Sequence, residues 1–425
     1  MIIHDILYSS RRRDRWWRFN LLKDAYTRAA SLARAGEPVA TPLRRAFSRL
    51  GYGTPAPALE AFWEEIVSAS RLCEQALDME VRQAKLISLG EKLQPDLLPM
   101  PGWLDMYRLC LAVGFFSAGK TLRDHGLAVA ANRARSAVDE QVLIPGFHAA
   151  LEKGRWDEAK MLLDRLKATE LSGGRIDQVQ WLLGLLSGAG DSTDYTRRDK
   201  MPDEDQEFAD LVKGKKLALV GPVPTTLPKG PEIDGFDCVV KFSYRGGEKG
   251  RDPQSQGRRI DISYYNNSQA AALSKIDYAE VLKELKFAVF LNRKGRSLFP
   301  ESERRMRRLT PFLWLLPDTH FNAGPNALFD LLRFAPAGVH VFNTDLMLSA
   351  GRFEGYRPAG ARQIDYTRSF IKTHDPVLQY EFMRLAWQAG CITGDQGFTE
   401  VMEMGIDTYL SRLQQVHGCV EQALL

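Results

Sequence analysis

The sequence has little of several features that would assign a protein to a special class. Five cysteines are spread over 425 residues, and no two of them have the spacing of a redox pair or a zinc site. We therefore expect free thiols in a reducing compartment. No apolar run reaches the roughly 18 residues of a membrane-spanning helix, and the first residues lack the apolar core of a signal peptide. These absences predict a cytoplasmic protein.

An excess of charge of one sign is missing as well. The net charge is +4 at neutral pH, and 26% charged and 44% apolar residues are ordinary for a globular protein. So mild a balance does not indicate a nucleic-acid partner. Arg11–Arg13 and Trp16–Trp17 form a basic and aromatic cluster that suits peripheral contact with the anionic inner face of a cell membrane. A helix whose tryptophans pack inward is the simpler interpretation, and we favour it.

The chain is long enough for more than one domain, and its hydrophobic pattern changes about half-way along. Residues 1–187 show helical periodicity, clearest in 150–168, where apolar residues recur at three- and four-residue steps on both sides of Gly154. That segment resembles a tetratricopeptide-type helical pair, and 103–134 and 26–50 predict two weaker ones. The first domain is therefore expected to consist of helical hairpins.

The helical region contains a string that imitates a nucleotide-binding loop. Residues 114–121 match G-x-x-x-x-G-K-[ST]. A phosphate loop needs a buried strand before it and a helix after it, so that backbone N–H groups converge on the phosphate. The preceding residues instead have helical spacing, and Phe115 and Phe116 are too bulky for such a loop. We interpret the string as a turn between helices; a kinase that uses Lys120 is the less favoured alternative.

Residues 188–214 are polar and rich in glycine and aspartate, which is typical of a linker. Asp203-Glu204-Asp205 in this segment would suit a divalent cation bound to a nucleotide diphosphate. Because these acids precede the first predicted strand rather than follow one, we interpret them as exposed linker residues and predict no metal site.

Short apolar strands alternate with helices in residues 215–425. The predicted strands are 217–220, 238–242, 260–265, 287–291, 312–316 and 339–342, and the predicted helices include 326–334, 376–389 and 399–404. This alternation predicts an α/β, Rossmann-like domain with a mostly parallel sheet. Ligands of such sheets bind outside the carboxyl ends of the strands, where Gly221 lets the backbone approach closely.

Two segments of this domain carry a specific family resemblance. Residues 220–243 combine Val-Gly, a turn, a Glu-Ile-Asp segment and a strand, and they resemble the large motif of sialyltransferases, glycosyltransferase family 29. Residues 257–266 match the next strand of that family. Residues 321–328, followed by a strand that ends at Asn343-Thr344-Asp345, resemble the family's small motif, in which a short polar turn opens a helix.

A third segment completes the family order. His374 and the helix after it resemble the very small motif, His-x-x-x-x-Glu. The three motifs together span about residues 215–395, a little under half of the chain. The order and spacing therefore identify the domain as similar to sialyltransferases, with a GT-A-like nucleotide-sugar fold implied.

The chain departs from the family pattern at several positions. Pro222 stands where the family has an Asn that contacts the nucleotide, and Lys241 and Ser243 replace an Arg and an Asn. Asn322-Ala323 replaces two hydroxyl residues, and Gln379 occupies the Glu position of the very small motif. Lysine keeps the positive charge but loses the bidentate geometry of arginine. These changes bear on the identity of the donor more than on the fold.

The resemblance implies a glycosyltransferase that moves a sialic acid or Kdo-type ulosonic acid from a CMP-sugar to a glycan hydroxyl, as in capsule or lipopolysaccharide synthesis. The donor has one phosphate, so we expect a metal-independent enzyme without a further cofactor. His374 is the implied general base. The implied CMP-sugar site comprises Gly221, Pro222, Val223, Thr225, Lys241, Ser243, Asn266, Asn322, Ala323, Gly324, Asn343, Thr344, Asp345 and Arg357.

A function of another class stays open. The substituted motifs also fit a catalytically inactive sialyltransferase-like scaffold whose helical half binds a protein partner. The basic stretch 292–308 fits an acidic acceptor or a membrane lipid, although a solvated helix face is favoured. Binding of CMP separates a transferase from a scaffold.

Overall fold

The computed structural model describes residues 2–69, 79–189, 201, 203–247, 252–353, 356 and 366–418, with side chains from residue 13 onward. Arg357, one of the predicted donor-binding residues, lies outside the described residues. Within the described part of the chain, no helix combines the length and the apolar character needed to cross a bilayer.

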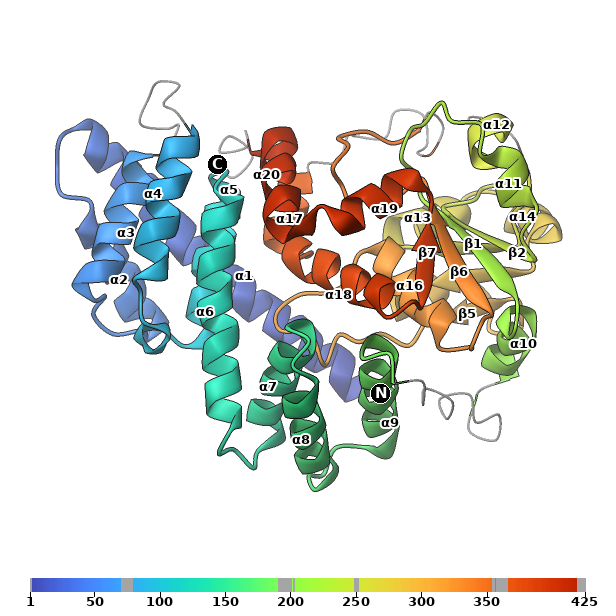
Figure 1. Cartoon of the computed structure of the whole chain (residues 1–425), viewed down its shortest axis with the longest axis horizontal. Coiled ribbons are helices and arrows are strands. Elements are labelled where there is room, and N and C mark those ends of the chain that lie inside the picture. Colours follow the sequence, from blue (N-terminus) through green and yellow to red (C-terminus); the bar gives the residue numbers. More distant parts are fainter. Residues whose placement is uncertain are drawn as a thin grey trace.

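The N-terminal half is built from helices that pack as antiparallel neighbours (Figure 1). They are α1 Ile2–Arg34, α2 Ala40–Leu50, α3 Pro57–Ser68, α4 Met79–Glu91, η2 Pro95–Leu97, α5 Met100–Ala112, α6 Phe116–Ala134, α7 Glu140–Glu152, α8 Trp156–Lys167 and α9 Gly173–Leu186. The turns between α5 and α6 and between α7 and α8 contain Gly114 and Gly154 with positive φ angles of 90° and 63°. The expected helical hairpins are therefore present, and their kinship with tetratricopeptide repeats stays a prediction.

The string at residues 114–121 is the turn and first part of a helix. It follows helix α5 rather than a strand, and α6 begins at Phe116. Lys120 lies inside α6 and pairs with Asp124 one turn later at 2.9 Å. The interpretation as a turn between helices is confirmed, and the phosphate-loop alternative is wrong.

The C-terminal half is an α/β, Rossmann-like domain. Its elements are α10 Asp203–Val212, β1 Lys216–Val220, α11 Gly230–Asp234, β2 Cys238–Phe242, α12 Pro253–Gln256, β3 Ile262–Tyr265, α13 Asn267–Leu273, α14 Tyr278–Glu284, β4 Phe287–Phe290, α15 Arg293–Arg296, β5 Met306–Arg308, α16 Ala323–Leu332, β6 Gly338–Phe342, α17 Tyr366–Lys372, α18 Pro376–Gln388, β7 Ile392–Gly394, α19 Gln396–Glu403 and α20 Gly405–His417. Every pair of neighbouring strands is parallel, in the order β5-β4-β3-β2-β1-β6-β7. The predicted parallel sheet is confirmed.

Five of the six predicted strands are present, and the sixth is wrong. Residues 312–316 form turns, because Phe312 stacks on Trp181 of α9 and Trp314 donates to Gln178. The sheet instead contains β5, whose central Arg307 is buried between two carboxylates. The arginines of β5 hide its apolar pattern, so the sequence did not predict this strand. The three-residue strand β7 was too short to predict.

The predicted linker includes a helix that belongs to the sheet domain. Phe208 of α10 makes edge contacts with Phe287 and Phe334. Asp205 is 8% exposed and pairs with Arg307 Nε at 2.6 Å. The interpretation of Asp205 as an exposed linker acid is therefore wrong.

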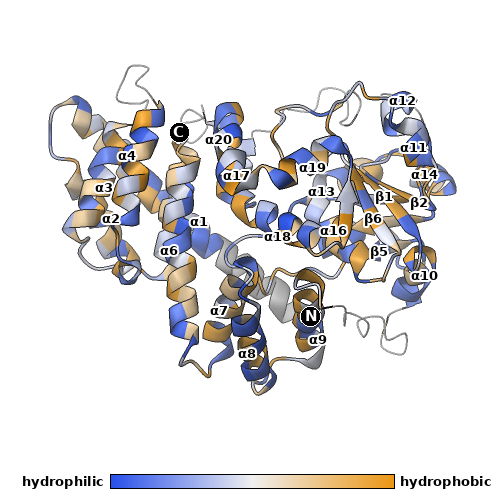
Figure 2. Ribbon diagram, viewed as in Figure 1, coloured by the Kyte–Doolittle hydropathy of each residue, from blue (hydrophilic) through white to orange (hydrophobic). Residues whose placement is uncertain are grey.

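The main apolar core continues from the helical half into the sheet domain. One cluster of buried side chains includes Trp63 and Phe147 on the helical side, and Leu217 and Leu219 of β1. Figure 1 shows α17, α18 and α20 between the N-terminal helices and the sheet, and these helices contact α5, α6, α7 and α9. Figure 2 shows hydrophobic residues along the strands and both hydrophobic and hydrophilic residues on most of the helices. The two halves therefore share one core.

The two tryptophans of the N-terminal cluster differ in exposure. Trp16 stacks on Phe19, with the Lys372 ammonium 4.7 Å from the centre of its ring. Trp17 is 49% exposed. The side chains of Arg11 and Arg12 lie outside the described residues. Inward packing thus holds for the first tryptophan, and contact with a membrane stays a prediction.

Candidate functional site

A cavity of about 490 Å³ opens at the carboxyl ends of β1, β2, β3 and β6. The chain runs outward from β1 through β2, β3, β4 and β5, and then returns to place β6 on the other side of β1. Open parallel sheets bind their ligands at such a switch point. The position of the cavity is therefore the one expected for a ligand site in this fold.

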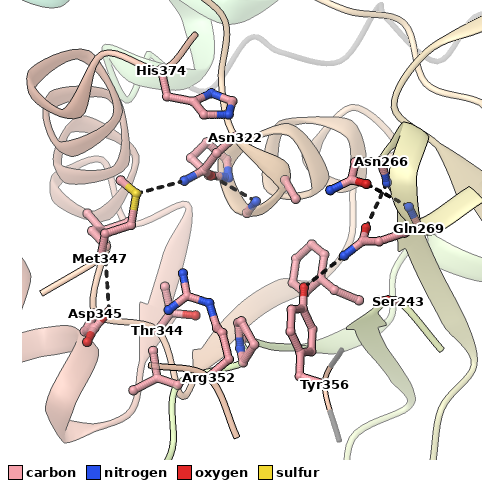
Figure 3. A pocket seen from close by; sticks show the side chains of 18 of the residues that line it. Ser243, Asn266, Gln269, Asn322, Thr344, Asp345, Met347, Arg352, Tyr356 and His374 are labelled. Atoms are coloured by element: carbon pink, nitrogen blue, oxygen red, sulfur yellow. Dashed lines mark hydrogen bonds between the residues drawn. The ribbon is translucent and has the colours of Figure 1, made fainter. Parts of the chain in front are cut away.

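Most of the predicted site residues meet at this cavity. Those that line it are Gly221, Pro222, Val223, Ser243, Asn266, Asn322, Ala323, Gly324, Thr344, Asp345 and His374. They come from all three motif segments. Figure 3 shows His374 near Asn322, across the cavity from Arg352 and Tyr356.

Three predicted residues are not brought to the cavity. Lys241 is 4% exposed and donates from Nζ to the carbonyl of Gly257 at 2.9 Å. Thr225 is half-buried and accepts the N–H of Leu227. Asn343 is buried, and its amide donates to the carbonyl of Ser255. Asn343 nevertheless shapes the site, because its own carbonyl accepts the N–H of Val223 at 3.1 Å.

The turn after β1 lies directly on the turn after β6. A Cβ atom on Gly221 would overlap Thr344 Oγ1 and the carbonyl oxygen of Asn343. The N–H of Gly221 donates to Phe342 at 2.8 Å, and Pro222 accepts the N–H of Phe353 at 3.0 Å. Glycine is required here by close approach rather than by its φ angle. Pro222 stiffens the turn and removes an N–H donor from it.

The small and very small motifs are tied together behind the cavity. Asn322 is the N-cap of α16, and its side-chain oxygen accepts the N–H of Gly324 at 3.1 Å. Gln379 is fully buried, accepts the N–H of Asn322 at 3.2 Å and donates to the carbonyl of Asp375 at 3.3 Å. Gln379, which stands at the Glu position of the very small motif, therefore links the segment of Asn322 to the segment of Asp375.

His374 lies at the rim of the cavity with its ring orientation fixed. Its Nδ1 is 3.1 Å from the carbonyl oxygen of His320, and the two histidine rings meet edge to face at 4.7 Å. A carbonyl only accepts, so Nδ1 carries the proton of this contact. In the neutral ring, Nε2 then has the lone pair. His374 therefore has the tautomer of a base that acts through Nε2.

The prediction missed several side chains of the cavity wall. Arg245 and Arg352 add positive charge, and Gln269 donates to the Tyr356 hydroxyl at 3.3 Å. Gln269 also forms a capping box with Asn266, whose Asn-x-x-Gln spacing is visible in the sequence. Arg352 stacks on the Tyr366 ring at 4.7 Å in a loop without a sequence signature. Spacing could have revealed Gln269 but not Arg352.

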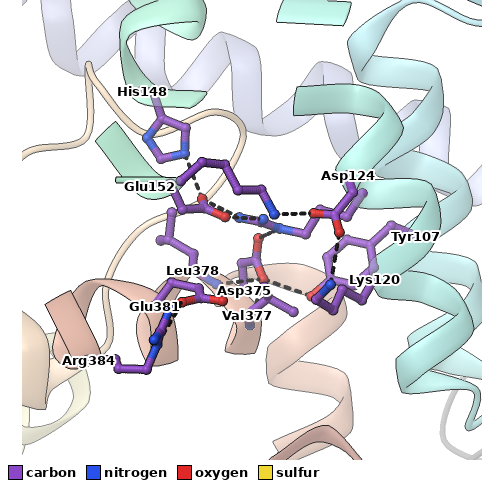
Figure 4. A network of polar contacts seen from close by, with 12 residues as sticks. Tyr107, Lys120, Asp124, His148, Glu152, Asp375, Val377, Leu378, Glu381 and Arg384 are labelled. Atoms are coloured by element: carbon purple, nitrogen blue, oxygen red, sulfur yellow. Dashed lines mark hydrogen bonds and ion pairs between the residues drawn. The ribbon is translucent and has the colours of Figure 1, made fainter. Parts of the chain in front are cut away.

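Helices of the N-terminal half hold the segment that carries His374 (Figure 4). Asp375, the next residue, caps α18 by accepting two backbone N–H groups. Tyr107 of α5 donates to Asp375 at 2.8 Å, and Arg123 of α6 pairs with it at 2.5 Å. Arg123 also forms a two-pronged pair with Glu152, one arm of which measures 2.7 Å. The cap beside His374 is therefore part of a buried network that joins both halves.

Burial and charge act in opposite directions in this network. Burial alone would raise the pKa of Glu152, but the charge and hydrogen bonds of Arg123, together with His148, hold that pKa well below its ordinary value. Burial raises the pKa of the Tyr107 phenol well above its ordinary value, and Asp375 raises it further. Tyr107 thus stays a donor, and Glu152 stays a carboxylate.

Ion pairs and hydrogen bonds also fix the loop that carries His320. Arg18 of α1 pairs with Asp105 at 2.8 Å and with Asp318 at 2.7 Å. Thr319 donates to the carbonyl of Thr373 at 3.0 Å and accepts the N–H of Asp375. The loop with His320 and the loop with His374 are therefore fastened to each other and to α1.

The described residues contain no group of three or more histidine, cysteine, aspartate or glutamate side chains placed to hold a metal ion.

Comparisons of the sequence with protein-family models and with curated proteins give no match. The likeness to sialyltransferases therefore stays a resemblance carried by three motifs, and the structure itself shows an α/β domain with those motifs around one cavity.

Proposed function

We propose that the chain is a glycosyltransferase of the sialyltransferase type, which moves a sialic acid or Kdo-type ulosonic acid from a CMP-sugar to a glycan hydroxyl. The observation that carries the proposal is the meeting of three separated segments, at Gly221, Asn322 and His374, around one cavity at the switch point of the sheet. The three segments resemble the sialyltransferase motifs and follow them in order. A GT-A-like nucleotide-sugar domain is the finer fold assignment that goes with this proposal.

The wall of the cavity suits a mononucleotide sugar. Apolar side chains such as Leu219, Phe242 and Val341 can cover a planar base and a sugar. Arg245 and Arg352 can neutralise the single phosphate of CMP and the carboxylate of the sugar. A donor with one phosphate carries less negative charge than a nucleotide diphosphate, which is in keeping with two arginines at the cavity.

His374 would act as the base of an inverting transfer. Its Nε2 takes the proton of the acceptor hydroxyl while the hydroxyl oxygen forms the new bond to the anomeric carbon. The bond between that carbon and the phosphate oxygen breaks, and CMP leaves with the electron pair. Arginine charge at the cavity then stabilises the leaving phosphate. The contact of Nδ1 with the carbonyl of His320 keeps the ring ready for this step.

The first experiment measures CMP binding by thermal shift, with UMP as the control nucleotide, and CMP release from CMP-sialic acid and from CMP-Kdo. We expect CMP to raise the melting temperature more than UMP does, and at least one donor to release CMP faster than it does without protein. If CMP gives no shift and neither donor is consumed, the transferase proposal fails and the inactive scaffold takes its place.

A further inference from the structure

A second cavity of about 640 Å³ adjoins the candidate donor cavity. The two cavities share five wall residues, namely Asn266, Ser268, Asn322, Ala323 and His374. The second cavity extends from this shared wall towards α15 and the loop that carries His320. His374 therefore borders both spaces and can contact molecules bound in either of them.

The charge of the second cavity is of one sign. Arg293 and Lys294 of α15 line it with exposed side chains, and His320 lies on the opposite loop. Among the described residues of this wall, none is an aspartate or a glutamate. The remaining polar groups include neutral amides and hydroxyls, such as those of Asn292 and Ser297. Neutral donors with two cations and no carboxylate favour an anion that also carries hydroxyl groups.

We propose that the second cavity is the acceptor site, and that it selects a glycan carrying a phosphate or carboxylate group. This inference rests on the proposed transferase function. The acceptor hydroxyl lies at His374 on the shared wall, and the anionic group of the acceptor lies farther out, against Arg293 and Lys294. Selection then depends on charge at a distance from the reacting hydroxyl.

The shared wall is what separates an acceptor site from an unrelated anion site. A base must lie within hydrogen-bond reach of the hydroxyl that it deprotonates. His374 lines both cavities, so a hydroxyl of a molecule in the second cavity can come within reach of its ring. An acidic sugar in the second cavity is therefore placed against the reacting end of the donor.

The test uses the full chain, with and without excess CMP, and three sugars that differ only in the group at C6: galactose, galacturonic acid and galactose 6-phosphate. Binding is measured by NMR titration. We expect at least one charged sugar to bind about tenfold more tightly than galactose, the size of a charge-assisted contact. The comparison of carboxylate with phosphate shows which anion the site prefers.

Two double variants locate the preference. Arg293→Gln/Lys294→Gln should reduce it to about twofold or less. Lys283→Gln/Arg304→Gln removes the same charge from exposed positions outside both cavities and should leave the preference intact. Equal binding of all three sugars by the native protein, or an unchanged preference in the Arg293 and Lys294 variant, overturns the inference. So does binding to phosphatidylglycerol vesicles through these two residues without any binding of charged sugars.

CMP affinity is measured on the same samples, so the two proposals can fail separately. CMP binding without a preference for charged sugars overturns the acceptor inference and leaves the donor site standing. A preference without CMP binding overturns both the transferase function and the acceptor role, and it reduces the second cavity to an anionic-sugar site.

Discussion

A backbone carbonyl fixes the tautomer of the proposed base. The ring of His374 donates from Nδ1 to the carbonyl of His320, so its position depends on the loop around His320 and not only on its own segment. The motif predicted His374 as a site residue, but no pattern in the sequence predicted its partner, because the two are 54 residues apart.

Lys241 was predicted as a site residue but does not line the cavity. Its neighbour Phe242 lines the cavity, and side chains alternate along a strand, so Lys241 faces the other side of the sheet.

Replacing His374 by Ala should reduce turnover about 100-fold or more, the usual size of a general-base contribution. CMP affinity should change little, because we propose that the phosphate and the base of the donor contact other residues. Steady-state rates and CMP titrations on the same protein check both expectations. A near-native rate removes His374 from the proposed mechanism.

Replacing Gly221 by Ala should destabilise the protein by about 1–3 kcal/mol, the usual cost of an overpacked site. The new methyl group would overlap Thr344 and the backbone of Asn343, so the turn must move and CMP binding should weaken. Urea unfolding and CMP titration measure the two effects. Gly324→Ala is the matched control in the same cavity, because the nearest atom to its added methyl group is 3.6 Å away. Equal losses in both variants would contradict the role of close approach.

Helices of one half position loops of the other. Asp375 caps α18 and also receives Tyr107 and Arg123 from the N-terminal helices, so the helical half supports the segment that holds His374. The sequence predicted the helical hairpins and five strands from periodicity and apolar runs. It did not predict β5 or this network, because a buried charged residue looks exposed in a one-dimensional pattern until its partner is known.

Tyr107→Phe tests whether the network positions the loop or only adds stability. The variant loses a buried hydrogen bond to a carboxylate, so its free energy of unfolding should be lower by about 1.5–3 kcal/mol. Because the cap beside His374 loosens, we expect kcat to fall with CMP affinity retained.

Tyr264→Phe is the matched control for this prediction. Tyr264 also donates to a buried carboxylate, Asp330, which pairs with Arg307, but this group lies outside the cavity walls. The Tyr264→Phe variant should lose a similar free energy of unfolding and keep its kcat. A similar loss of kcat in both variants would show that Tyr107 has no positioning role.

At the scale of the whole molecule, a shared apolar core and buried ion pairs join halves that the sequence pattern separates. Glu152 is central to the network. Its pKa in the folded protein lies below its ordinary value, so its contribution to stability is complete above the unfolded pKa of about 4.3 and is lost as the pH falls below it.

Glu152→Gln should therefore lower the free energy of unfolding by about 3 kcal/mol at pH 7, because Arg123 loses a buried partner. The difference from the native protein should shrink as the pH falls below about 4, because the carboxylate of the unfolded chain becomes protonated there while that of the folded protein stays ionised to a lower pH. Urea unfolding midpoints across this pH range measure the difference. Glu280→Gln, at an exposed surface pair, should change little at any pH. A difference that stays constant with pH would contradict the assignment.

The two outermost strands of the sheet, β5 and β7, have three residues each. An exposed strand edge is a template on which another chain can add by backbone hydrogen bonding, and short edges limit such growth. The central strands are apolar and would be hazardous if they stood at an edge, but both of their sides are occupied. The strand order therefore protects the folded protein against edge-to-edge aggregation and favours its recovery at high concentration.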